Sequence, residues 1–462
     1  MGKLALATLG RLHAKIGDFW WYSLMLFCAA RAADCLNVFV GLWLVPKYVP
    51  PSELGAVQPL ANFATFLAIP AGVFAATFRQ EISNLAAKRE FGKMKSLMRG
   101  VFIATAIFFF LALVTTRIVL PSFLWRIRVA EGSLGIVILA ASFAGTVSSI
   151  YTNPLQALKK FKATSAIQIL GAPIRLIVML VTMPYRALVG YFVGQASTPT
   201  FNIIASVAAL WKELSVPAER YWGMPVVRRF GKLFAIFGIG SLAGGIATLV
   251  ETTIIRQRLP EMDSAAYYIV TRFSEISSFL MSTLAFTIFP FAAELAAKGK
   301  NTNTLVVKAG AAITITNALL AGFFAFFGRQ IVALLPNGSG YAEFDWAIPC
   351  LIGITTVNAL SSLYTTAELS ANRFAYTLYM VPLHLAYAAA LLFVTGYGYV
   401  APYLPKCVDE FFLAHNVRSL STILMWMAAF AFVKLAFCVA HAKMRRAPSA
   451  DIDNAKQAPP SL

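Results

Sequence analysis

Long apolar stretches separated by short polar segments make up most of this 462-residue chain. The first, residues 19–45, is long enough to cross a bilayer, because about 20 apolar residues span its hydrocarbon core. Eleven further stretches follow, at about 55–78, 100–116, 134–151, 166–183, 188–211, 233–255, 265–289, 305–327, 347–366, 376–395 and 420–440. The pattern predicts an all-α polytopic membrane protein with about 12 transmembrane helices.

The longest polar interval in the middle of the chain, residues 212–232, separates six predicted spans from six. We expect a cytoplasmic linker there, between an N-terminal six-helix bundle (19–211) and a C-terminal six-helix bundle (233–440). Residues 1–18 are basic with scattered leucines, which is typical of an amphipathic helix on a membrane surface. The polar, proline-containing segment 441–462 is expected to be a disordered cytoplasmic tail.

A weak internal repeat relates the two predicted bundles. A shift of 210 positions without gaps places residues 50–56 over 260–266 and residues 85–88 over 295–298. Six spans per copy keep both copies in the same orientation. We therefore expect parallel repeats, related by an axis along the membrane normal.

Composition strengthens the membrane interpretation. The chain is 59% hydrophobic and only 13% charged, whereas about 25% of a soluble domain is charged; the mean hydropathy is +0.70. The net charge is +19, but the basic residues lie in the loops, which favours attraction to anionic membrane lipids over nucleic-acid binding. Twenty-four basic residues lie on the side of both termini and ten on the other, so the positive-inside rule places both termini in the cytoplasm.

The residues that usually hold metals show no suitable spacing. The five cysteines form no C-x-x-C pair and the four histidines no H-x-x-x-H pair, so we expect neither a metal site nor a cofactor. The cysteines are expected to pack as small hydrophobic residues. A D-x-D at 451–453 lies in the predicted tail, where chance explains it better.

Charged residues occur where a bilayer makes them costly. Arg31 and Asp34 lie near the middle of the first span, three residues apart, and so share one helix face. They form either an ion pair that only holds helices together or part of a polar cavity that handles a charged substrate. Intramembrane ionisable residues are functional candidates by default, which favours the cavity. Arg272 and Glu275 repeat the same spacing in the eighth span.

Three arginines are the predicted substrate-binding residues: Arg31, Arg175 in the fifth span and Arg272. A guanidinium group binds phosphate bidentately and keeps its charge when it is desolvated. The set therefore favours an anionic, phosphorylated substrate over a cationic drug.

Three carboxylates are candidates for coupling transport to a proton or sodium ion: Asp34, Glu251 and Glu275. For Asp34, holding Arg31 in place is the open alternative. Glu251 lies late in the seventh span, and we favour interfacial pairing with Arg256 or Arg258 over ion coupling.

The sixth span carries polar residues and a proline around its midpoint, with Gln195, Pro199 and Asn202 among them. A proline within a helix frees a backbone carbonyl, which is tolerated where other helices or cavity water satisfy it. These residues predict either a cavity wall or a kinked packing helix.

As a whole, the pattern resembles the polysaccharide flippases of the multidrug, oligosaccharidyl-lipid and polysaccharide (MOP) exporter superfamily, over about residues 17–440. The resemblance rests on the twelve spans, on the turn Pro51-Ser52-Glu53-Leu54-Gly55 with its counterpart at 260–268, and on Glu251 followed by Thr252-Thr253-Ile254-Ile255. In the second copy Ala265 stands where Gly55 stands in the first, which departs from the turn motif. The first span, with its arginine, is similar to that of the lipid II flippase branch.

This resemblance implies a transporter rather than an enzyme, with a MATE-like fold. Such proteins move undecaprenyl-pyrophosphate-linked oligosaccharides to the outer leaflet of the bacterial cytoplasmic membrane by alternating access, for surface polysaccharide biosynthesis. We expect a monomer whose partners are this lipid-linked substrate and membrane lipids.

Two other functions stay open. A multidrug exporter of the same fold would favour acidic and aromatic cavity walls, which the intramembrane arginines argue against. A membrane polysaccharide polymerase or ligase would need a sizeable outer loop with catalytic residues; the longest predicted outer loop, 396–419, offers Asp409, Glu410 and His415.

Overall fold

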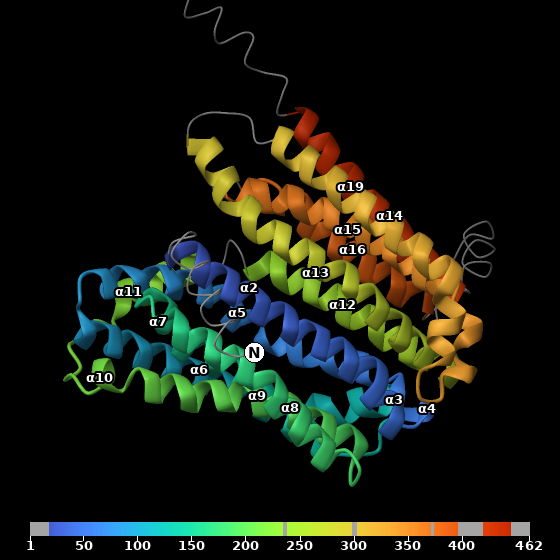
Figure 1. Cartoon of the computed structure of the whole chain (residues 1–462), viewed down its shortest axis with the longest axis horizontal. Helices are drawn as coiled ribbons and strands as arrows, with labels where there is room; N and C mark the ends of the chain where they lie inside the picture. The colour runs from blue at the N-terminus through green and yellow to red at the C-terminus, as the bar shows by residue number, and fades with distance from the viewer. Residues whose placement is uncertain (1–17, 234–237, 298–302, 371–373, 396–418, 445–462) are drawn as a thin grey trace, which may run out of the picture. The chain divides into compact units, whose positions relative to one another are not determined.

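The computed structural model describes residues 18–233, 238–297, 303–370, 374–395 and 419–444, and all regular structure in this part of the chain is helical. Twelve of its α-helices have 19 or more residues (Figure 1): α2 (Asp18–Phe39), α5 (Val57–Ala87), α6 (Phe91–Arg126), α7 (Ser133–Ala157), α8 (Phe161–Thr182), α9 (Ala187–Ala209), α12 (Ile239–Arg258), α13 (Glu261–Ala297), α14 (Asn303–Ala333), α15 (Ala347–Ser370), α16 (Thr377–Thr395) and α19 (Leu420–Met444). The predicted all-α fold is confirmed, and each predicted span overlaps one of these helices.

Short helical elements connect the long ones. A π-helical turn (Val40–Leu44) and α3 (Val45–Tyr48) continue α2, and α4 (Pro51–Leu54) precedes α5. Between α9 and α12 lie α10 (Trp211–Leu214) and α11 (Met224–Leu233), and two 3₁₀ turns (Gly338–Gly340 and Ala342–Phe344) precede α15. Within the described residues, seven helices are long and apolar enough to cross a membrane: α6, α7, α8, α14, α15, α16 and α19.

Several helices extend beyond the apolar stretches that predicted them. Helix α6 runs from Phe91 to Arg126, whereas hydropathy indicated a span over 100–116. The basic segment 79–99, expected as a loop, is helical except for a turn at 88–90. A helix satisfies its backbone hydrogen bonds internally, so it can continue into the aqueous phase. Hydropathy detects only the part that lies in hydrocarbon.

The chain divides into two compact units. The first contains Met1–Ile269 and Leu335–Asn337, and the second contains Val270–Leu334 and Gly338–Leu462. In the first unit α7 packs against α5, α6 and α9, while α8 packs against α2 and α9 (Figure 1). In the second unit α15 packs against α14 and α19.

The division into units falls inside α13, not within 212–232. Helix α12 packs against α5 and so belongs to the first unit. The organisation into two six-helix bundles stays a prediction.

The segment 212–232, predicted as a linker, is folded onto the first unit. Lys160 Nζ lies 2.9 Å from Glu213 Oε1, and Lys95 Nζ donates a hydrogen bond to Val216 O at 3.1 Å. The Trp222 ring lies against Gly100 so closely that a Cβ on this glycine would overlap it. The segment is therefore a packed part of the fold.

Some predictions fall outside the described residues. These are the amphipathic segment 1–18 except for its last residue, the D-x-D at 451–453, and the outer-loop residues Asp409, Glu410 and His415. Helix α19 continues to Met444, four residues into the predicted tail.

Candidate functional site

Arg31 and Asp34 form an ion pair on α2. Arg31 Nη2 lies 3.0 Å from Asp34 Oδ2, and the two side chains are 29% and 25% exposed. Their spacing of three residues brings the side chains together on one helix face. The charges are thus paired within one helix while both groups stay accessible to a third partner.

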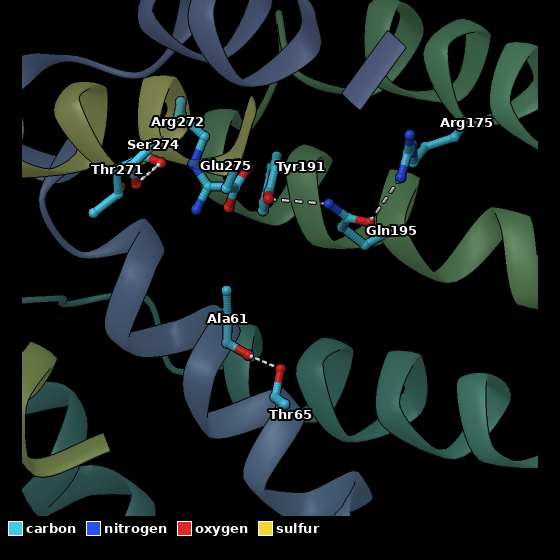
Figure 2. Close-up of polar contacts among 9 residues, drawn as sticks. All are labelled: Ala61, Thr65, Arg175, Tyr191, Gln195, Thr271, Arg272, Ser274 and Glu275. Carbon is cyan, nitrogen blue, oxygen red and sulfur yellow. Dashed lines mark hydrogen bonds and ion pairs between the residues drawn. The ribbon is translucent and has the colours of Figure 1, made fainter. Parts of the chain in front are cut away.

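Helix α8 supplies that partner, Arg175. Helix α8 packs against α2, and Asp34 interacts electrostatically with both Arg31 and Arg175. Arg175 Nη1 lies 3.4 Å from Gln195 Oε1 on α9 (Figure 2). Arg175 Nε is buried and has no acceptor among the described residues. Arg31, Asp34, Arg175 and Gln195, which we call the α2–α8–α9 cluster, therefore contain two guanidinium groups and one carboxylate.

Gln195 links Arg175 to a tyrosine that sequence reasoning missed. Gln195 Nε2 donates a hydrogen bond to the hydroxyl of Tyr191 at 2.9 Å (Figure 2), and Tyr191 is buried. The two residues are four positions apart on α9 and so share a face. This spacing is the signal that could have found Tyr191.

Helix α9 stays helical through Pro199. Next to the proline, Thr198 Oγ1 donates a hydrogen bond to Gly171 O on α8 at 3.0 Å. A Cβ on Gly171 would lie 3.0 Å from Thr198 Cγ2 and 3.3 Å from Asn202 Oδ1, so this glycine allows α8 and α9 to approach closely. Asn202 Oδ1 is buried without a donor among the described residues. The role of Pro199 and Asn202 in a cavity wall stays a prediction.

The second predicted pair, Arg272 and Glu275, lies on α13 in the second unit (Figure 2). Arg272 Nη1 lies 2.8 Å from Glu275 Oε1 and 3.0 Å from Oε2. The ion pair that the spacing predicted is present. The roles of Arg272 in substrate binding and of Glu275 in ion coupling stay predictions.

Glu251 is half-buried on α12, beside Thr252, whose hydroxyl accepts a hydrogen bond from Asn62 Nδ2 on α5 at 3.2 Å. Arg256, a predicted partner of Glu251, is 1% exposed. Its Nε donates to Ile127 O at 2.9 Å, and its Nη2 donates to Ser52 O. Two donor atoms of Arg256 thus bind backbone carbonyls, which a search for opposite charges in the sequence overlooks.

Comparisons with known proteins identify the fold. No family model and no curated protein matches the chain in sequence. A structure described as "Lipid II flippase MurJ, inward closed conformation" matches with a TM-score of 0.66 at 14% identity, over 91% of this chain and 87% of that one. An inward-facing multidrug resistance MATE family transporter of the MOP superfamily matches with a TM-score of 0.61 at 12% identity, over 89% of this chain and 94% of that one.

A third match is a MOP superfamily transporter from Pyrococcus furiosus whose description reports a reverse polarity of the binding pocket. Its TM-score is 0.61 at 14% identity, over 92% of this chain and 94% of that one. At such identities the comparisons show the fold alone. Together with the seven apolar helices in the described part of the chain, they indicate a multi-pass membrane protein. The predicted resemblance is confirmed at this level: the chain has the fold of the MOP superfamily transporters.

Proposed function

We propose that this protein is a flippase that moves an undecaprenyl-pyrophosphate-linked oligosaccharide across the bacterial cytoplasmic membrane by alternating access. The observation that carries the proposal is the α2–α8–α9 cluster. It places two guanidinium groups around one carboxylate, inside a transporter fold.

The charge balance of this cluster favours an anionic ligand. Two arginines and one aspartate leave an excess of one positive charge, which is costly within a bilayer. A pyrophosphate group offsets this excess, and guanidinium groups bind phosphate oxygens with two parallel hydrogen bonds. The unused Nε of Arg175 is a further donor for such a ligand. Gln195 and Tyr191 are suited to orient Arg175 through the hydrogen bonds that join them.

Asp34 is the preferred candidate for ion coupling. It competes with an anionic substrate for Arg31 and Arg175, with both of which it interacts. Protonation of Asp34 would remove this competition, so proton binding and substrate binding favour each other by linkage. Glu251 and Glu275 are the remaining candidates for coupling to a proton or sodium ion, and Arg272 is a second substrate contact.

The proposal extends to the setting of the protein. Both termini lie in the cytoplasm of a bacterial cell, the protein acts as a monomer, and anionic lipids attract its basic cytoplasmic loops. The charge asymmetry of 24 against 10 basic residues supports this orientation.

The function is tested by transport in proteoliposomes that contain the purified protein. A fluorescently labelled undecaprenyl-pyrophosphate-linked oligosaccharide is placed in one leaflet, and its arrival in the other is measured with a membrane-impermeant quencher. We expect the wild type to move the lipid and Arg175→Ala to lose most of this activity. Arg175→Lys is the matched control, because it keeps the charge but loses the planar fork that binds two oxygens. Equal rates for wild type, Arg175→Ala and empty liposomes would contradict the proposal.

A multidrug exporter of the same fold is the second candidate, because a MATE family transporter shares this architecture. The same proteoliposomes separate the two functions when they are loaded with a fluorescent organic cation. The excess of guanidinium groups predicts no movement of the cation. Extrusion of the dye without flipping of the lipid-linked sugar would establish the exporter. A lengthened or transferred glycan in the same preparation would instead indicate a polymerase or ligase.

A further inference from the structure

Four chain segments meet at one end of the first unit: residues 46–55, 127–128, 256–264 and 335–337, which we call the junction. All of them belong to the first unit. Arg256 is its most buried charge. This side chain is 1% exposed, and it donates hydrogen bonds to Ile127 O at 2.9 Å and to Ser52 O. One arginine thus ties the end of α12 to the turn after α6 and to α4.

Asn337 makes the second connection. Its Nδ2 donates a hydrogen bond to Pro46 O on α3 at 2.9 Å. Asn337 has φ of 58°, a left-handed backbone conformation that asparagine adopts more readily than most residues. This backbone conformation and the side-chain bond together fix the segment after α14 on the start of α3.

The two connections are related by the internal repeat. The 210-residue offset between the predicted copies pairs Pro46 with Arg256 and Ile127 with Asn337. The contact of Arg256 with Ile127 O therefore corresponds to the contact of Asn337 with Pro46 O, with donor and acceptor exchanged. Each contact joins the end of the first span of one copy to the segment after the third span of the other.

The repeated turns themselves pack against each other. Gly55 in the first copy faces Ser264 in the second, and a Cβ on Gly55 would overlap Ser264 Oγ. Leu54 and Ala265 beside them are 0% exposed. This close approach explains why the turn of the first copy has a glycine. A Cβ at residue 55 would require Ser264 to shift.

We propose that the junction is a latch that holds the outer end of the protein closed. The hydrogen bonds of Arg256 and Asn337, which the repeat relates to each other, are the contacts that keep it closed. The inference rests on the proposed alternating-access function, and the charge asymmetry assigns this end to the outer side of the membrane. Access from outside requires the two copies to separate here, which breaks both contacts. Water then hydrates the Arg256 guanidinium group, and this hydration offsets part of the loss of its hydrogen bonds.

The latch is tested by access of reagents to the junction. Ser264 is 1% exposed, and Ser264→Cys is introduced after the five native cysteines have been replaced. The labelling rate by a membrane-impermeant maleimide, added from outside, then reports opening. We expect Arg256→Ala and Asn337→Gly each to raise this rate about fivefold to tenfold, since each removes hydrogen bonds made only in the closed state. Glycine tolerates the left-handed backbone conformation, so Asn337→Gly reports the lost amide alone.

Arg117→Ala is the matched control, because Arg117 is an exposed arginine on α6, outside the four segments of the junction. It should leave the labelling rate unchanged. If Arg256→Ala fails to fold, Asn337→Gly tests the same latch from the other copy. Unchanged labelling in Asn337→Gly, or equal acceleration by Arg117→Ala, would overturn the proposal.

A disulfide tests the same latch in the opposite direction. A Cβ on Gly55 would lie 2.9 Å from Ser264 Cβ, somewhat less than the usual separation of about 3.8 Å in a disulfide. Oxidation of Gly55→Cys/Ser264→Cys should stop flipping, and reduction should restore it. Unimpaired flipping by the oxidised protein would overturn the latch. Labelling needs no substrate, so failure of the proposed function and failure of the latch are distinguishable.

Discussion

The two arginine–carboxylate pairs have the same spacing in the sequence but different surroundings in the structure. Arg31 and Asp34 form an ion pair on α2, and Asp34 also interacts electrostatically with Arg175 on α8. On α13, Arg272 Nη1 lies 2.8 Å from one carboxylate oxygen of Glu275 and 3.0 Å from the other. The carboxylate of the first pair thus interacts with arginines on two helices, whereas both carboxylate oxygens of the second contact the arginine three residues before it.

This difference shows what residue spacing can and cannot establish. A separation of three residues predicts an ion pair on one helix face in both cases. It does not predict that Asp34 also interacts with Arg175, since that depends on the packing of α2 against α8. A carboxylate shared by two arginines can be displaced by an anionic ligand, so we assign the first pair the larger part in substrate binding.

The largest predicted effect separates Arg175 from Arg272. Arg175→Ala should lower the initial flipping rate about 100-fold, because truncating one member of a desolvated charge cluster commonly costs that much. Arg272→Ala should have an effect at least tenfold smaller, because Arg272 already contacts both carboxylate oxygens of Glu275 and we assign it the smaller part in substrate binding. Quantitative flipping assays at equal protein density measure both. Equal losses would break the distinction between the pairs.

Exchanging the charges within each pair gives the next largest contrast. Arg272→Glu with Glu275→Arg should keep flipping within about threefold of wild type, because an ion pair at this spacing forms in either order. Arg31→Asp with Asp34→Arg should lower flipping about tenfold, because the new arginine would lie closer to Arg175 and like charges repel. The single variants Asp34→Arg and Glu275→Arg serve as controls. Equal tolerance of both exchanges would show that Asp34 has a structural role only.

Replacing each carboxylate by the amide of the same shape tests whether the charge of Asp34 competes with the substrate for the arginines. Asp34→Asn resembles the protonated residue, so it should raise affinity for the lipid-linked substrate about fivefold at neutral pH. It should also abolish the gain in affinity that protonation gives the wild type at lower pH. Glu275→Gln should retain that pH dependence. The affinity for the labelled substrate, measured from pH 5 to 8, distinguishes the two residues. If the affinity of Asp34→Asn still depended on pH, another residue would carry the coupling proton.

The sequence was a reliable guide to helices and a partial guide to the site. Each apolar stretch predicted a helix because lipid solvation requires an uninterrupted apolar run. The helix ends differed, as at the start of α6, because polar turns carry no hydropathy signal. Spacing along one helix also predicted the pairing of Arg31 with Asp34.

Features that depend on packing between helices could not be predicted from the sequence. The approach of Arg175 to Asp34 requires the register of α8 against α2. The burial of Arg256 was missed because its acceptors, Ile127 O and Ser52 O, are backbone atoms that every residue possesses. Only their position distinguishes them, and position is a property of the fold.

The smallest predicted effect concerns Tyr191, whose hydroxyl accepts the hydrogen bond from Gln195 Nε2. Tyr191→Phe leaves this amide donor without its partner, so Gln195 should orient Arg175 less well. One neutral hydrogen bond contributes about 1 kcal/mol, which corresponds to roughly a fivefold lower flipping rate at most. Tyr185→Phe is the control, because Tyr185 is 85% exposed. A loss as large as that of Arg175→Ala would indicate that Tyr191 contacts the substrate itself, and the α2–α8–α9 cluster would then include Tyr191 as a binding residue.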